Sequence, residues 1–220
     1  ALLIQAIIGS VLIGATMYLA LHLQIVMGLS PLMAGLANVA MTVVILAVVP
    51  VFAKLLPAIG PRPLMIAGPL CAAAGLFLLS FITVEGAYVT HILPGLVLLG
   101  IGLAMIFVPL QNLALTGVAP HDAGAASATV NSAMQIGGSI GLSVFTVFYA
   151  NASADALALG AAPFTAFTDG YSAVFLAASV ALVIASLIAV FMIRGSKSDL
   201  MPEPAAGRTA DEAALLVHAG

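Results

Sequence analysis

The sequence predicts an all-α membrane protein with six transmembrane helices. None of the first 53 residues is Asp, Glu, Lys or Arg, and the same holds for residues 63–84, 86–121, 123–154 and 170–193. A charged side chain costs several kcal/mol in hydrocarbon, so uncharged runs of this length indicate segments that cross a bilayer. A mean hydropathy of +1.27 agrees. The apolar runs are continuous, which excludes a β-barrel, whose strands alternate polar and apolar residues.

Turn chemistry divides the uncharged runs into spans. Gly28 favours a helix end, and Ser30 before Pro31 favours the start of the next helix. The predicted spans are about 1–27, 31–53, 63–84, 89–115, 123–150 and 170–193. Each exceeds the roughly 20 residues that cross a bilayer. Together they form a predicted bundle over residues 1–194, and the charged, proline-containing residues 195–220 form a predicted flexible cytoplasmic tail.

The few charges predict the orientation of the bundle. The cations near the spans fall on one side, at Lys54, Arg62, Arg194 and Lys197. The charged residues in the predicted loops of the opposite side are all acidic: Glu85, Asp155 and Asp169. By the positive-inside rule, the first side and both termini are cytoplasmic.

The start of the chain and its cysteine content set two further expectations. The chain opens directly on a hydrophobic stretch at Ala1 without a basic leader, which favours a chain cut from a larger multi-span protein. Cys71 is the only cysteine, so we expect neither a disulfide framework nor a metal cluster. No cofactor is expected.

Small residues predict where helices pack closely. Gly137 and Gly141 form a GxxxG pair, and Gly138 lies between them. Span one carries a similar stripe of small residues. That stripe consists of Ala6, Ser10 and Gly14. Small side chains let helix backbones approach each other, so ordinary bundle packing is the simplest interpretation, although such helices also suit a bundle that moves.

Polar residues inside the spans are the candidate binding residues. Asn131 and Gln135 lie one turn apart at mid-depth of span five, and Asn38 with Thr42 occupies the same zone of span two. They either line a ligand cavity or make interhelical hydrogen bonds worth about 0.6 kcal/mol each. Gln5, Gln24, His22 and His91 lie nearer the span ends, and we expect them to be hydrated. No carboxylate falls within a predicted span.

An ordered series of motifs resembles the drug:proton antiporters of the major facilitator superfamily, in particular the fourteen-span multidrug branch. The motifs lie at 28–35 (GLSPLMAG), 60–64 (GPRPL), 107–114 (FVPLQNLA), 121–127 (HDAGAAS) and 135–141 (QIGGSIG). The resemblance covers residues 1–195 and implies the C-terminal six-helix bundle of such a transporter. It implies proton-coupled efflux of drugs or other small amphipathic compounds by alternating access, and a missing N-terminal bundle. It also implies a location in the bacterial cytoplasmic (inner) membrane.

Two departures from the family pattern limit what the resemblance carries over. The cytoplasmic signature loop retains Lys54, Gly60, Pro61 and Arg62, but Pro57 and Ala58 stand where the family has an acidic–basic pair. Met134 stands where the family commonly has an arginine before the glutamine. A loop-ordering or coupling role of those charges therefore cannot be assigned to this chain.

Other classes of protein fit the sequence less well. An intramembrane protease needs a nucleophile and base, or two aspartates, at depth, and the predicted spans hold neither arrangement. We therefore expect no enzyme and no nucleic-acid partner. A six-span structural or assembly subunit without transport activity stays open as the alternative, because packing alone would produce the same small-residue stripes.

Overall fold

Six long helices make up the computed structural model of the chain, which describes residues 2–115 and 123–192. They are α1 (Leu2–Leu21), α2 (Pro31–Ile59), α3 (Pro61–Leu79), α4 (Leu93–Leu115), α5 (Ala123–Ala158) and α6 (Pro163–Met192). Two one-turn π-helices, η1 (His22–Val26) and η2 (Tyr88–Ile92), extend α1 and precede α4. Six of these stretches are long and apolar enough to cross a membrane, which confirms the predicted fold class and number of spans. The predicted tail at 195–220 lies outside the described residues.

Local sequence explains where the helices turn. Ser30 caps the start of α2, where its side chain accepts a hydrogen bond from the Met33 N–H at 3.3 Å, and Pro31 follows in the first turn. Gly60 has a φ of 78°, a conformation that glycine adopts without strain, and it separates α2 from Pro61 of α3. The predicted end of span two at 53 is wrong, because α2 continues to Ile59 and includes Lys54.

The largest departure from the predicted boundaries is at the turn between α5 and α6. Asp155 and Asp169, predicted to lie in a loop, are exposed residues of α5 and α6, which leave only a short connection through Gly160. The intervening segment is rich in alanine, a strong helix former, and Pro163 suits the first turn of a helix. At 1.5 Å per residue, a 36-residue α5 is about 54 Å long, so its end extends beyond roughly 30 Å of hydrocarbon.

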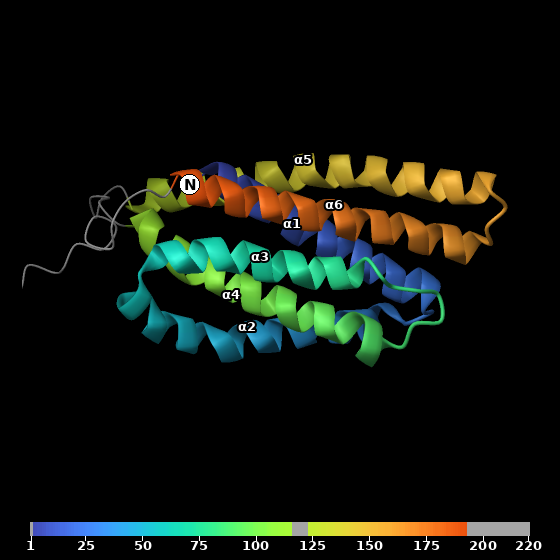
Figure 1. The fold of residues 1–220 in the computed structure, drawn as a ribbon, viewed down its shortest axis with the longest axis horizontal. Coiled ribbons are helices and arrows are strands. Elements are labelled where there is room, and N and C mark those ends of the chain that lie inside the picture. The colour runs from blue at the N-terminus through green and yellow to red at the C-terminus, as the bar shows by residue number, and fades with distance from the viewer. Residues whose placement is uncertain (1, 116–122, 193–220) are drawn as a thin grey trace, which may run out of the picture.

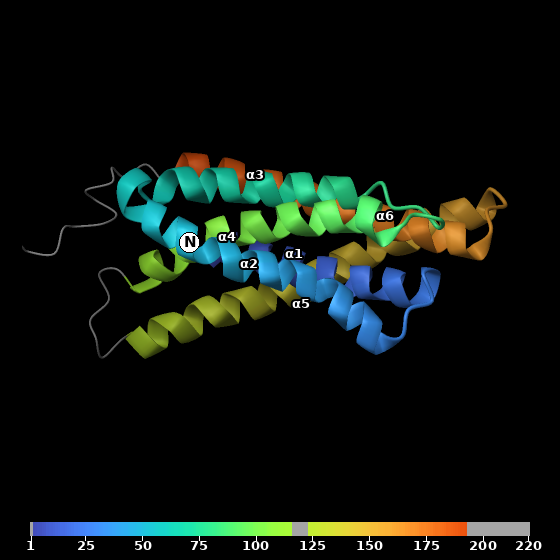
Figure 2. The same ribbon diagram turned by 90° about the horizontal axis from the view of Figure 1, so that it is seen from below.

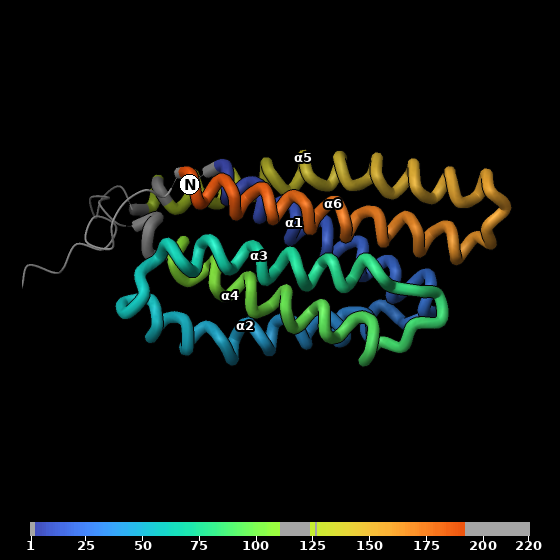
Figure 3. Tube along the Cα trace, viewed as in Figure 1, coloured from blue at the N-terminus to red at the C-terminus, as the bar shows by residue number. Residues whose placement is uncertain are grey.

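The helices run alternately up and down the bundle (Figure 3). Lys54 and Arg62 therefore lie at the end where α1 begins and α6 finishes, while Glu85 and the α5–α6 turn lie at the other end (Figure 1). In Figure 1, α5 follows one edge of the bundle and α2 the opposite edge, with the other four helices between them. Figure 2 shows α3 on one side of the molecule and parts of α2 and α5 on the other.

The packing of the helices is largely preserved when the two halves of the bundle are exchanged. The most extensive contacts join α3 to α4, α1 to α5, α3 to α6, α5 to α6 and α2 to α4, followed by α1 with α6. Exchanging α1–α3 with α4–α6 converts the α1–α5 pair into α4–α2 and the α3–α4 pair into α6–α1. The α5–α6 pair breaks this correspondence, because α2 and α3 scarcely touch. An inverted repeat about an axis in the membrane plane stays a prediction that this pattern favours.

Burial is uneven around the bundle. The core is built mainly on α1, α3, α4 and α6, with Tyr171 and Phe175 of α6 among its largest fully buried side chains. By contrast, 11% of the most apolar window of α2 and 22% of that of α5 is buried, against 61% for η2 and α4. The two helices at the edges therefore expose most of their surface.

Candidate functional site

A polar stripe follows α5 through the middle of its span. Asn131, Gln135, Ser139 and Ser143 recur at every fourth position, and all four are exposed. Thr146 continues the stripe toward the α5–α6 turn. From Asn131 to Thr146 the stripe covers about 22 Å of helix, which is most of the hydrocarbon thickness. Sequence reasoning placed only the two amides in the site and missed the hydroxyls, although their four-residue spacing is readable in the sequence.

The hydroxyl and amide groups of this stripe differ in how they are satisfied. Ser139 donates to the Gln135 carbonyl at 3.1 Å, Ser143 to the Ser139 carbonyl at 3.0 Å, and Thr146 to the Leu142 carbonyl at 2.8 Å. These hydroxyls are bonded within their own helix, so they are tolerated beside lipid. The side-chain amides of Asn131 and Gln135 make no hydrogen bond to any other described residue, so their donors and acceptors are available to a ligand or to water.

The second pair of candidate residues lies on α2. Thr42 is exposed, while Asn38 is half-buried and donates from Nδ2 to the Ala34 carbonyl at 3.0 Å. Its Oδ1 is buried without a partner among the described residues. Since α2 and α5 stand at opposite edges of the bundle, the structure does not bring Asn38 and Thr42 into one cluster with Asn131 and Gln135 (Figure 1).

The glycines of α5 form the seam with α1. A Cβ added at Gly137 would collide with the backbone of Ala6, and one added at Gly141 would collide with Ser10. Gly138 faces Ile13 in the same way. At this close approach the Ser10 hydroxyl donates to the Gly137 carbonyl across the interface at 2.5 Å. The seam therefore holds α5 in place and lies on a different face of the helix from the polar stripe.

The signature-loop residues occupy the end of the bundle where α2 meets α3. Gly60 and Pro61 are buried, and Lys54 and Arg62 are exposed. The described carboxylates, at Glu85, Asp155 and Asp169, lie toward the opposite end of the bundle (Figure 1). No acidic side chain in the described part of the chain reaches either cation, so both are free to face water or lipid headgroups.

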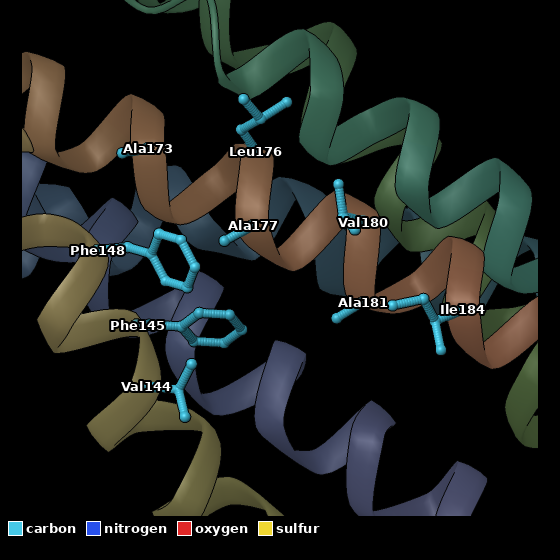
Figure 4. A pocket seen from close by; sticks show the side chains of 9 residues that line it. All are labelled: Val144, Phe145, Phe148, Ala173, Leu176, Ala177, Val180, Ala181 and Ile184. Carbon is cyan, nitrogen blue, oxygen red and sulfur yellow. The ribbon is translucent and has the colours of Figure 1, made fainter.

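An apolar groove runs between α5 and α6. It encloses about 420 Å³ and is lined by side chains without a polar group: Val144, Phe145, Phe148, Ala173, Leu176, Ala177, Val180, Ala181 and Ile184. Figure 4 shows the two phenyl rings of α5 directed toward the facing turns of α6. Known ligand sites add a few placed polar groups to an apolar lining. This groove has no polar group to orient a ligand, so we assign it no binding role.

Two polar side chains that we expected to be hydrated are buried. His22 is 1% exposed and Gln5 is 4% exposed, and neither Nδ1 of His22 nor Oε1 of Gln5 has a hydrogen-bond partner among the described residues. His91, at the same end of the bundle as His22, is exposed as expected. Position near a span end was a poor guide to burial here, because α6 packs against η1 and places the ring of Tyr171 beside the imidazole of His22.

The structure thus combines six apolar helices with a polar face on α5 that includes two side-chain amides without a described partner. In the described part of the chain, no group of His, Cys, Asp and Glu side chains could hold a metal ion. The sequence profile of the Major Facilitator Superfamily matches residues 1–142. The chain belongs to this superfamily.

Relatives of the chain carry names of resistance and export proteins. The puromycin resistance protein pur8 of Streptomyces alboniger is 32% identical over 87% of this chain and 39% of its own length. The cephamycin export protein CmcT of Amycolatopsis lactamdurans is 38% identical over 58% of this chain and 26% of its own length. The multidrug efflux pump LfrA of Mycolicibacterium smegmatis is 32% identical over 66% and 29%. The chain thus spans well under half the length of these relatives.

Proposed function

We propose that this chain forms the C-terminal six-helix bundle of a larger secondary transporter. The transporter exports drugs or other small amphipathic compounds in exchange for protons, and it works by alternating access. Membership of the superfamily and the names of its relatives support export of such compounds. The charge pattern supports a cytoplasmic-membrane location with both termini in the cytoplasm.

The free amides of Asn131 and Gln135 are the observation that carries the proposal. An amide facing lipid leaves hydrogen bonds unmade, which is costly in hydrocarbon, so these side chains face either water or a second protein surface. In an alternating-access transporter the site lies between two bundles at the bilayer midplane, where it meets both conditions in turn. The polar stripe of α5 then forms one wall of the pathway, with Asn131 and Gln135 binding the polar groups of the substrate.

The exposed surfaces of α2 and α5 support a second bundle as the partner. Both helices are far less buried than the other four, although each carries polar residues at mid-depth. Coverage of 39% of the length of a relative leaves ample chain for such a bundle. Asn38 and Thr42 on α2 are the residues that we expect to line the cavity from the opposite edge.

Export assays on the complete transporter test the proposal. Asn131→Ala and Gln135→Ala should each lower export of a fluorescent drug severalfold, while the amount of protein in the membrane stays unchanged. Asn151→Ala is the matched control, because Asn151 is also exposed on α5 but lies on another face of the helix. At ~100° per residue, it is rotated by about 200° from Asn131. Unchanged export in both test variants would assign the amides to helix packing.

A liposome assay on residues 1–220 alone separates the half-transporter from a complete one. The chain should insert but should not drive uptake or release of the drug when a proton gradient is imposed, because one bundle cannot alternate access by itself. Gradient-driven drug movement by this chain alone would contradict the proposed arrangement.

A further inference from the structure

The buried imidazole of His22 packs against one ring of a cluster of three tyrosines, which three helices contribute. Its ring centroid lies 5.6 Å from that of Tyr171, with the two planes at 83°. Tyr171 in turn lies 5.1 Å from Tyr149, and Tyr18 lies 5.5 Å from Tyr149 and 6.2 Å from Tyr171. Tyr18 belongs to α1, Tyr149 to α5 and Tyr171 to α6. The cluster thus forms where the three helices meet, near the end of the bundle opposite Lys54.

Two features set His22 apart from a histidine that only fills space. Its Nδ1 is buried without a hydrogen-bond partner among the described residues, whereas buried polar atoms are normally paired. It is also the first residue of η1, where its carbonyl accepts the Met27 N–H at 3.1 Å in π-helical register. Single π-helical turns are rare and occur frequently at functional sites. A neutral imidazole at this position leaves a basic nitrogen unused.

The cluster is connected to the polar stripe of α5. The Tyr18 hydroxyl, on a side chain that is 5% exposed, shares a hydrogen bond of 2.8 Å with the hydroxyl of exposed Thr146. Tyr18 precedes His22 by four residues, so the two side chains lie on the same face of the continuous helix formed by α1 and η1. The Tyr18–Thr146 contact therefore joins the polar stripe to the helix face that carries the imidazole.

We propose that His22 is a proton-binding site of this bundle, reached from the polar stripe of α5 when the Tyr18–Thr146 contact opens. In the tautomer that carries its hydrogen on Nε2, the Nδ1 lone pair accepts a proton from a hydronium ion, which leaves water and an imidazolium. Tyr171, within about 6 Å, offers the ring on which a cation is favoured. When the contact closes again, the imidazolium is cut off from water and returns its proton to the next water that reaches it. This inference rests on the proposed transport function for its role, but not for the binding itself.

No fixed charge competes for this proton in the surroundings of His22. The helices that touch η1 are α1, α2 and α6. Tyr18 faces the cluster from α1 and Tyr171 from α6, with Tyr149 of α5 behind them, and residues 31–53 of α2 contain no titratable side chain. Asp169 on α6 and Asp155 on α5 are exposed. The imidazole of His22 is therefore the only basic side-chain nitrogen among the described residues named here.

Nitrogen NMR on the chain in lipid nanodiscs, labelled with ¹⁵N-histidine, tests the binding directly. The ring nitrogens of His22, assigned with His22→Gln, should change from the neutral to the imidazolium pattern as the pH falls. Tyr18→Phe, which removes the hydroxyl bonded to Thr146, should move the pH of this change for His22 and leave exposed His91 unaffected. A His22 signal that stays neutral at every pH at which the chain remains folded, in both wild type and Tyr18→Phe, would overturn the proposal.

Export by the complete transporter tests the role of the site. His22→Gln should abolish the dependence of drug export on an inward proton gradient, and His91→Gln should retain it. If His22 titrates but no variant or wild type exports drugs, the proposed function fails and the proton site remains. If export occurs and keeps its full gradient dependence in His22→Gln, the proton site fails as a coupling group and the proposed function remains.

Discussion

Replacing Gly137 with alanine should destabilise the bundle by opening the seam between α1 and α5. The added Cβ would collide with backbone atoms of Ala6, which cannot rotate away as a flexible side chain would. Overpacking of this kind typically costs about 1–3 kcal/mol, and an obstacle made of backbone favours the upper end. Separation of the helices would also break the 2.5 Å hydrogen bond from Ser10 to the Gly137 carbonyl, worth about 0.6 kcal/mol.

One effect of the same substitution acts in the opposite direction. Alanine is a better helix former than glycine by up to about 1 kcal/mol, which offsets part of the cost. Overpacking near 3 kcal/mol and the lost hydrogen bond of about 0.6 kcal/mol, less about 1 kcal/mol of helix propensity, give a net loss of about 2.5 kcal/mol in the free energy of unfolding. Gly35→Ala supplies the matched control, since a Cβ at Gly35 of α2 would meet nothing within 4 Å and only the helix-propensity term applies.

Unfolding of the purified chain in mixed micelles, with increasing mole fraction of a denaturing detergent, measures the difference. Circular dichroism should give a clearly lower midpoint for Gly137→Ala than for wild type, and an unchanged or slightly higher midpoint for Gly35→Ala. Equal midpoints for the two variants would show that α1 and α5 are not in backbone contact at this position, and would refute the seam.

Two further predictions concern topology and the attachment of α2. On a cysteine-free background of the complete transporter, in which Cys71 and any other cysteine are replaced, Glu85→Cys should react with a membrane-impermeant maleimide on intact cells and Ile59→Cys only after permeabilisation; the reverse pattern would overturn the predicted orientation. Tyr88→Phe removes the 2.6 Å hydrogen bond from the Tyr88 hydroxyl to the Ala37 carbonyl. Hydrogen exchange should then become faster at residues 31–40, compared with exposed Thr90→Ala, and unchanged exchange would show that this bond does not hold α2.

Much of the fold is readable from the distribution of charge and turn residues. Hydrocarbon excludes charges so strongly that the uncharged runs, with the turn residues at 28–31 dividing the first of them, predict six spans, and the described part of the chain has six. The boundaries that failed are those drawn at charged residues near helix ends. Asp155 and Asp169 show why: a helix can extend beyond the hydrocarbon, so a carboxylate there reaches water without ending the helix.

The candidate site was predictable only in part. The four-residue spacing of Asn131 and Gln135 places them on one face of a helix in any fold, and both are exposed on α5. Which neighbours this face has is a separate matter that spacing does not fix. Tertiary packing sets it, by placing α5 at one edge of the bundle and α2 at the other (Figure 1).

The sequence by itself determined that this protein is a helical membrane bundle, because the penalty for charge in lipid acts on each segment separately. It also determined which residues share a helix face, because the helical period is local. Only the tertiary structure decided which polar residues are buried. His22 lies near the end of its span, as the sequence indicates, but α6, from a distant part of the chain, packs against η1 there and places Tyr171 beside the imidazole. Burial depends on these long-range contacts, and no local pattern encodes them.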